Sequence, residues 1–223
     1  MNVTVDENIF EFYRRIVYGV NYSKKDARDI AFIEKWCFDA AWKAMSQHVL
    51  KWNRGVTDSE KENEKQTVFE NYFKGKWSNI NNNSGINGLN NNGNNDGKGL
   101  INYVFNFFDN KINNNTSKVK EFSCGHAQKL VNMFFKHLYT FKDYNNQIAN
   151  FDFSICDCPV DNTTLKRIKA VINKCGITGS GNYYKYNGNS WSNLDWGSYI
   201  KIQNMIDTVK GNKTRLEYEF DWE

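Results

Sequence analysis

Long apolar runs are missing from this chain, and their absence excludes the usual signature of a membrane protein. No stretch of 18 or more apolar residues occurs, although 40% of the 223 residues are apolar, so we expect no transmembrane helix. The opening residues MNVTVDENIFEFYRR carry acidic side chains where a signal peptide would have a basic region and then an apolar one. We therefore expect a cytoplasmic protein that does not contact a membrane.

Cysteine and proline are also scarce. The five cysteines are an odd number at irregular spacing, which is not the disulfide framework of a small secreted domain and favours reduced thiols. No internal repeat, heptad series or catalytic signature of high specificity occurs. The aromatic content of 16% is nevertheless ample for a packed core. The sequence thus predicts a folded chain whose activity no motif identifies.

Apolar residues recur at steps of three and four over most of the chain, which predicts helices. The predicted helices cover residues 6–20, 23–52 and 125–141, a segment that follows a cap at Asp161, and a segment between Ser192 and Gly211. We expect a mainly α fold, a single helical domain over 1–223, with N-terminal helices in 1–78 and a C-terminal helical part in 100–223.

Two segments depart from this pattern. Residues 79–99 are rich in Asn and Gly, a composition that buries too little apolar surface to fold, so we expect a disordered insertion. The C-terminal RLEYEFDWE alternates apolar and charged residues, which predicts a short β-strand or an amphipathic tail that docks elsewhere.

The net charge of +4 comes from one part of the chain. Residues 111–175 contain ten basic and five acidic residues, whereas the rest is nearly balanced. A local excess of this kind attracts anions such as phosphates, although the same count is also compatible with a solvated face that has no partner.

Polar residues adjoin the core face of the predicted helix 125–141. Lys129, Asn132 and Lys136 are three and four residues apart, with Gln128 beside them. Amide and ammonium groups together could hold a nucleobase edge and a phosphate. The alternative is that the amides satisfy backbone groups of adjacent loops while the lysines face water.

Three further groups complete the predicted ligand site. The helix start has backbone amides without helical partners, and these favour anions. A basic stretch follows residue 165, and a Gly- and Asn-rich segment carries tyrosines on which bases could stack. The residues are, in order, Ser123, Gly125 and His126; Lys166, Arg167 and Lys169; and Tyr183, Tyr184 and Tyr186.

Sulfur and imidazole form a separate constellation. Cys124, His126, Cys156 and Cys158 are chemically suitable zinc ligands, but a gap of one residue within each pair strains simultaneous binding. A thiol enzyme would use Cys124 or Cys158 as the nucleophile and His126 as the base, with Asp157 or Asp161 to orient it.

The motifs SCGHAQKLVNMFFKHLY, CDCPVDNTTL and LEYEFDW resemble uncharacterised proteins of AT-rich bacteria and their phages. This resemblance implies a prokaryotic or viral setting and no particular activity. Our leading hypothesis is non-enzymatic binding of a small nucleotide or a nucleic acid. In the first case, a phage protein could sequester a nucleotide of host immune signalling. The alternatives are a zinc-dependent or thiol enzyme and a protein-interaction module whose C-terminal strand pairs with a partner's sheet edge.

Overall fold

In a computed structural model, residues 29–47, 50–79, 99–175 and 190–220 are described, and this part of the chain is mainly helical, as predicted. One isolated antiparallel bridge joins Trp52 to Val119, and the described residues form no β-sheet. Short helical turns separate the α-helices. The α-helices are α2 (Ile30–Ser46), α3 (Asp58–Val68), α4 (Leu100–Asn113), α5 (Cys124–Tyr139), α6 (Asn146–Ala149), α7 (Asn162–Cys175), α8 (Trp196–Val209) and α9 (Arg215–Tyr218).

Side-chain caps explain where several of these helices begin. The predicted cap Asp161 is confirmed, because its carboxylate accepts the backbone N–H groups of Thr163 and Thr164 at the start of α7. The predicted cap of the next helix is wrong by three residues. Asp195, rather than Ser192, accepts the N–H of Ser198 at the start of α8.

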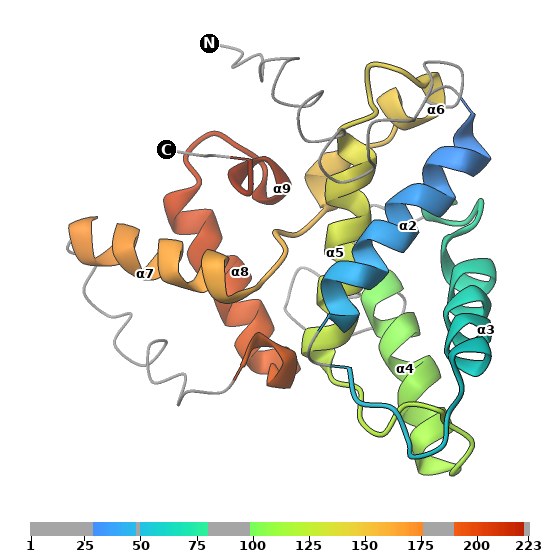
Figure 1. The fold of residues 1–223 in the computed structure, drawn as a ribbon. Coiled ribbons are helices and arrows are strands. Elements are labelled where there is room, and N and C mark those ends of the chain that lie inside the picture. Colours follow the sequence, from blue (N-terminus) through green and yellow to red (C-terminus); the bar gives the residue numbers. More distant parts are fainter. Residues whose placement is uncertain (1–28, 48–49, 80–98, 176–189, 221–223) are drawn as a thin grey trace.

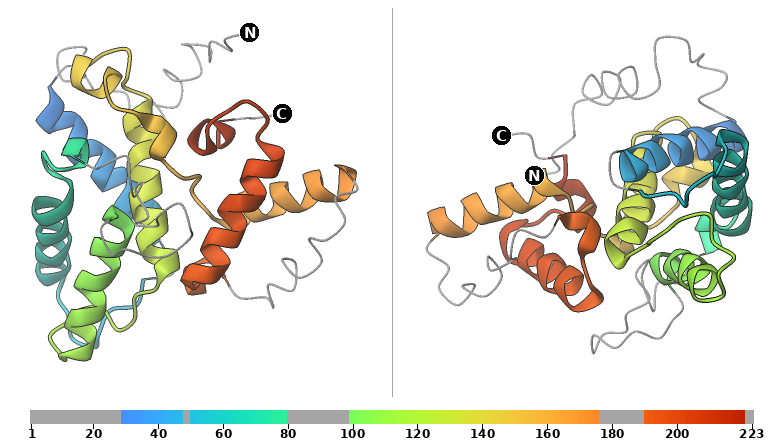
Figure 2. Two further views of the ribbon diagram at one scale, coloured as in Figure 1. Left: turned by 180° about the vertical axis from the view of Figure 1, so that it is seen from behind. Right: turned by 60° about the horizontal axis from the view of Figure 1, so that its bottom comes forward.

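Helix α5 lies at the centre of the fold, and all sixteen of its residues are buried. It packs against α2 and α4 on one side and against α8 and the turn at Trp191–Asn193 on the other (Figure 1). Helix α7 packs mainly on α8, and its far end extends away from the other helices in every view (Figures 1 and 2). The fold therefore surrounds α5 and leaves α7 at the periphery.

Aromatic side chains join α5 to the segments that precede it in the sequence. The Phe73 ring lies 4.9 Å from that of Phe38 in α2 and 4.8 Å from that of Phe134 in α5. All three are fully buried. Contacts at these separations add to the free energy gained by removing the rings from water. The predicted core face of 125–141 is thus part of the apolar interior.

The predicted C-terminal strand is wrong for residues 215–218, which form the single helical turn α9. Thr214 and Glu217 form a capping box, in which each side chain accepts the backbone N–H of the other residue. This box satisfies the backbone locally, whereas a strand needs a neighbouring strand. Leu216 and Tyr218 are buried against the chain's own core, so this stretch does not offer an edge to a partner.

Several predicted segments lie outside the described residues. They include the helix at 6–20, the start of the helix at 23–52, and the Asn-rich insertion except for its two ends, Asn79 and Gly99. Among the described residues, we find no helix with the length and apolar character that spanning a membrane requires.

Candidate functional site

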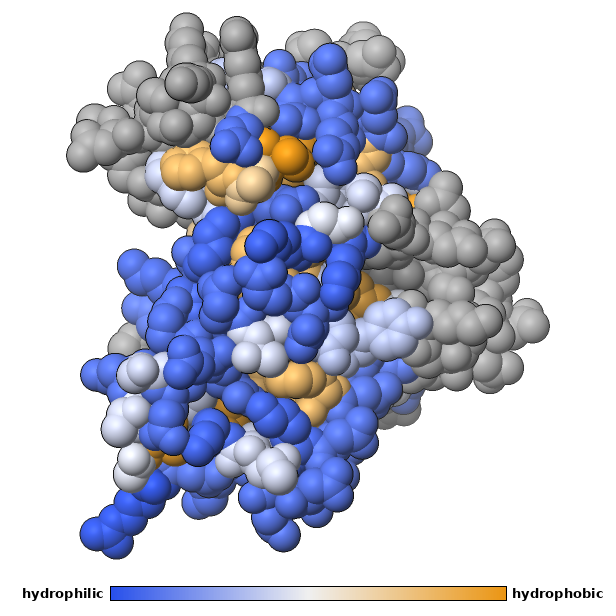
Figure 3. Space-filling model, turned by 90° about the vertical axis from the view of Figure 1, so that its right-hand side faces the viewer, coloured by the Kyte–Doolittle hydropathy of each residue, from blue (hydrophilic) through white to orange (hydrophobic). Residues whose placement is uncertain are grey.

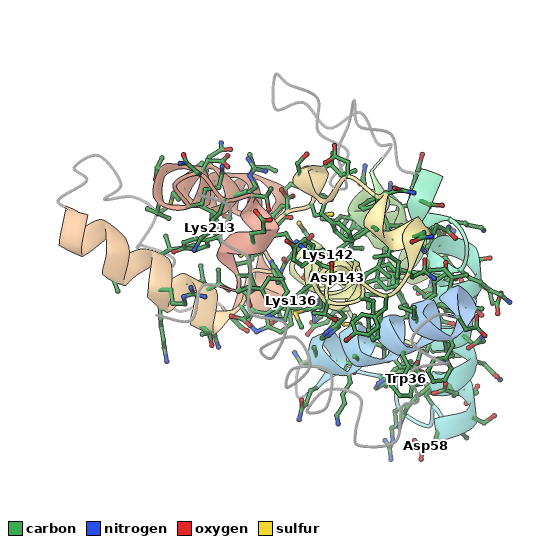
Figure 4. All side chains as sticks on the ribbon, turned by 90° about the horizontal axis from the view of Figure 1, so that it is seen from above. Trp36, Asp58, Lys136, Lys142, Asp143 and Lys213 are labelled. Carbon is green, nitrogen blue, oxygen red and sulfur yellow. The ribbon has the colours of Figure 1, made fainter. Side chains whose placement is uncertain are left out.

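The polar strip predicted on α5 is present, but it faces the interior of the protein. Lys129 and Lys136 are each 5% exposed, and Gln128 and Asn132 are fully buried. The strip faces residues 156–161 and the C-terminal helices, and Lys136 lies where α5 meets these helices (Figure 4). Buried polar groups cost free energy unless they are paired, so the partners of this strip determine its role.

Two glutamines hold the extended segment around Pro159. The Gln128 amide donates to the Val160 carbonyl over 2.8 Å and accepts the Val160 N–H over 3.1 Å. Gln203 of α8 does the same for Cys158, at 2.7 and 3.1 Å. Each glutamine therefore satisfies both backbone groups of one residue. These paired amide contacts fix the segment between α5 and α8.

Asn132 begins a chain of hydrogen bonds that reaches α9. Its amide donates to the Tyr199 hydroxyl over 2.9 Å, and that hydroxyl donates to Asp157 over 2.7 Å. Arg215 donates to the other oxygen of Asp157 over 2.6 Å. Burial raises the pKa of Tyr199, and the neighbouring Asp157 raises it further, so the phenol remains a neutral donor.

Both lysines of the strip are paired with carboxylates. The Lys129 ammonium lies 2.6 Å from Asp161, and that of Lys136 lies 2.8 Å from Glu219. Burial raises the pKa of Asp161, but the Lys129 ammonium and the hydrogen bonds from Thr164 outweigh this effect and leave the pKa below its ordinary value. The amides thus satisfy backbone groups, as one alternative predicted, whereas the lysines do not face water.

The start of α5 is covered by the turn at 190–194. The Ser123 hydroxyl caps the helix by accepting the His126 N–H over 3.2 Å, and it donates to the Ser192 carbonyl. The Gly125 N–H donates to the Leu194 carbonyl over 3.2 Å. His126 Nδ1 accepts the Ser123 N–H over 3.1 Å. Protein carbonyl oxygens therefore occupy the position where the sequence predicted that an anion would bind.

The four predicted zinc ligands are buried, and the structure does not bring them together. Among the described residues, no group of three or more His, Cys, Asp or Glu side chains is arranged to hold a metal. Instead, the Cys158 thiol lies 3.6 Å from a carboxylate oxygen of Glu219, and His126 serves the capping box with Ser123. Cys158 and His126 thus make separate local contacts instead of sharing a metal.

The thiol-enzyme hypothesis meets a second difficulty. Burial raises the pKa of Cys124, Cys156 and Cys158, and neighbouring carboxylates raise it further. A thiolate is the reactive form, so these buried thiols are poorly activated. The two aspartates proposed to orient the base are used elsewhere, Asp157 by Tyr199 and Asp161 as the cap of α7.

The basic excess of 111–175 is partly neutralised within the fold. Among the described residues, four of its basic side chains pair with carboxylates, and three of those carboxylates come from other parts of the sequence. A count of charges in the sequence therefore overstates the charge that this segment presents at the surface. The four pairs are Lys111 with Glu64, Lys118 with Glu60, Lys129 with Asp161, and Lys136 with Glu219.

Helix α7 differs from α5 in this respect. Lys166 is exposed, and no carboxylate of the described residues lies within ion-pair distance of it. Arg167 is half-buried, with its guanidinium 5.3 Å from the centre of the Tyr218 ring and a hydrogen bond of 3.4 Å to the Tyr218 carbonyl. The remaining members of the predicted ligand site have side chains outside the described part: Lys169, Tyr183, Tyr184 and Tyr186.

One groove of about 500 Å³ lies between α2 and α3 and is lined by Trp42, Trp52 and charged side chains. Most of these charges pair with one another: Lys65 lies 2.8 Å from Asp39, and Lys61 lies 2.7 Å from Asp58. The side of the molecule that carries α3 is mostly hydrophilic, with small apolar patches (Figure 3). Because its charges balance, this groove favours no class of ligand.

Comparisons of the chain with protein-family models, curated proteins and solved structures find no match. The functional argument therefore depends on the side chains. Sequence reasoning did not place Tyr199, Gln203, Arg215 or Glu219 in the buried network. A signal existed for Gln203 alone, because it is a polar residue within the apolar stretch YIKIQNMI.

The buried side chain of His137 in α5 predicts that stability depends on pH. Burial lowers the pKa of His137 well below the ordinary value of 6.5, and Lys136 and Lys129 lower it further. The unfolded chain therefore binds a proton more tightly, so stability is complete above about pH 6.5 and falls below it. We expect this histidine to remove about 1 kcal/mol from the free energy of unfolding between pH 6.5 and 5.5.

Urea denaturation of the wild type and of His137→Gln at both pH values measures this effect. The variant should lose about 1 kcal/mol less than the wild type. Burial raises the pKa of Glu34, which has the opposite sign but cancels in the difference between the two proteins. Equal losses would show that His137 is not the group responsible.

Proposed function

We propose that the protein is a non-enzymatic binder of a phosphate-bearing ligand and that Lys166 and the other basic residues of α7 make the contact. The observation that carries the proposal is the exposed Lys166, which has no carboxylate partner among the described residues. An unneutralised ammonium at the surface attracts phosphate and can bond to it directly.

The composition of α7 supports this assignment. Its fourteen residues include Lys166, Arg167, Lys169 and Lys174 and no acidic residue. Helix α5 also contains lysines without acidic residues, but carboxylates of other elements neutralise them. The charge of Lys166 therefore remains available, whereas Lys129 and Lys136 of α5 are paired.

Arg167 supports the proposal in a second way. Its guanidinium rests over the Tyr218 ring and bonds to the Tyr218 carbonyl. These contacts restrict the side chain before any ligand arrives, so binding costs less conformational entropy.

The strip on α5 is the weaker candidate for the same ligand. A phosphate at Lys129 or Lys136 would displace Asp161 or Glu219 and leave a buried carboxylate without its cation. Separating a buried ion pair costs about 3–5 kcal/mol. We therefore assign the strip a structural role, in which it attaches α7, α8 and α9 to the central helix.

Reversal of one charge tests the proposal. We expect Lys166→Glu to weaken binding about tenfold, which is about 1.4 kcal/mol, because a favourable contact with phosphate becomes repulsive. Fluorescence anisotropy with a labelled 24-nucleotide DNA and a labelled ATP analogue measures the affinity. Lys43→Glu is the matched control, since Lys43 is also exposed on a helix and has no carboxylate partner among the described residues.

The control should bind as the wild type does. If neither probe binds the wild-type protein, the proposed function is wrong. Equal losses in the two variants would mean that the overall charge, rather than α7, governs binding.

A further inference from the structure

We infer that the ligand of α7 is a nucleic-acid duplex contacted along its backbone, and not a small nucleotide. This inference rests on the function proposed above and narrows its ligand to one class. Three features of α7 carry it: the shape of the surface that the helix presents, the exposed stripe along it, and the burial of its apolar side.

The first feature is convexity. Helix α7 packs mainly on α8 and extends away from the rest of the described helices (Figures 1 and 2). Small ligands bind in concave pockets that remove most of their surface from water. The outward side of a projecting helix is convex, and a duplex can surround such a surface with its own groove. The major groove of B-DNA is about 12 Å wide, which accepts a helix about 10–12 Å in diameter.

The second feature is an exposed stripe that follows the helix axis. Asn162, Lys166 and Ala170 are all exposed and lie four residues apart, so they share one face. Thr164 and Ile168 occupy the opposite stripe and are 1% and 3% exposed. The outer stripe carries an amide, an ammonium and a small residue, which suits close approach to a polyanion. With fourteen residues, the helix is about 21 Å long and spans roughly six phosphates of one strand.

The third feature distinguishes nucleic acid from an anionic membrane. A basic amphipathic helix binds a membrane by inserting its apolar side between the lipids. In α7, Ile168 is buried and Leu165 is packed against the core. This part of the apolar side is therefore unavailable to lipid, whereas Asn162, Lys166 and Ala170 are exposed.

The experiment is a set of anisotropy titrations of the full chain with a labelled 24-base-pair DNA duplex and a labelled ATP analogue in 50 and 200 mM KCl. Sedimentation with anionic vesicles is the third arm. Three phosphate contacts would release enough counterions to weaken duplex binding about 40-fold over this range. Lys166→Ala should lower the slope of log affinity against log salt by about 1, and Lys43→Ala should leave it unchanged.

The possible outcomes separate the two proposals. Duplex binding with this salt dependence, together with at least 100-fold weaker binding of the ATP analogue, supports the inference. Equal affinity for both probes overturns the inference and leaves phosphate recognition in place, whereas binding to the vesicles alone overturns both proposals. A salt slope that is the same for Lys166→Ala and the wild type also overturns it. Failure to bind any of the three overturns the proposed function as well. Circular dichroism melting of the alanine variants confirms that they are folded.

Discussion

We expect Arg215→Met to lower the free energy of unfolding by about 3 kcal/mol. The guanidinium of Arg215 lies 2.6 Å from Asp157 and contacts Asp207 at 2.5 Å. It thereby joins α9, α8 and the segment that precedes α7. Asp157 is only 1% exposed, so methionine leaves a buried carboxylate without this cation. We place the loss at the lower end of the range for buried pairs because the Arg215 side chain keeps 24% of its surface exposed.

Urea denaturation measures the loss, and two further variants show its cause. Arg54→Met removes an exposed arginine that has no carboxylate partner among the described residues, so it should change stability by less than about 0.5 kcal/mol. In an Asp157→Asn background, Arg215→Met should lower the free energy of unfolding by at least about 1 kcal/mol less, because no buried carboxylate is left without its cation. Identical costs in both backgrounds would exclude the ion pair as the reason.

The position of the polar strip could be predicted from sequence, but its role could not. Helical spacing alone places Lys129, Asn132 and Lys136 on one face beside the core. Whether that face meets water, a ligand or the rest of the chain depends on where segments 26 to 83 residues away are packed. Local periodicity contains no information about those distant segments.

The basic excess shows the same limit. Ion pairs form between residues that are close in space, and Glu60, Glu64 and Glu219 reach their lysines from outside residues 111–175. A count over a segment cannot include them. Lys166 lies on α7 at the periphery of the described helices and has no carboxylate partner among the described residues.

The strand predicted at the C-terminus was wrong for a different reason. Alternation of Leu216, Tyr218 and Phe220 with charged residues satisfies the pattern of a half-buried strand. The capping residues Thr214 and Glu217 satisfy the pattern of a helix start equally well. With no second strand among the described residues to supply hydrogen bonds, the local helix is the lower-energy choice.

A substitution at the start of α5 should also lower the stability of the protein strongly. A Cβ atom added at Gly125 would lie 2.1 Å from the Trp191 carbonyl oxygen and 2.9 Å from the Ser192 carbonyl carbon. Both are backbone atoms, so relief requires the turn at 190–194 to move away from the helix. We expect Gly125→Ala to lower the free energy of unfolding by about 3 kcal/mol. Amide hydrogen exchange in residues 190–194 should accelerate, because their contact with α5 is lost.

Gly197 is a close match for this test, since each glycine is the second residue of its helix, after a capping Ser or Asp. A Cβ atom at Gly197 would meet only the Asp195 carboxylate, at 3.4 Å, which is an ordinary contact. Gly197→Ala should therefore raise the free energy of unfolding by about 0.5 kcal/mol, because alanine favours the helix. If both substitutions stabilise the protein, the turn does not cover the start of α5, and the helix amides would again be available for an anion.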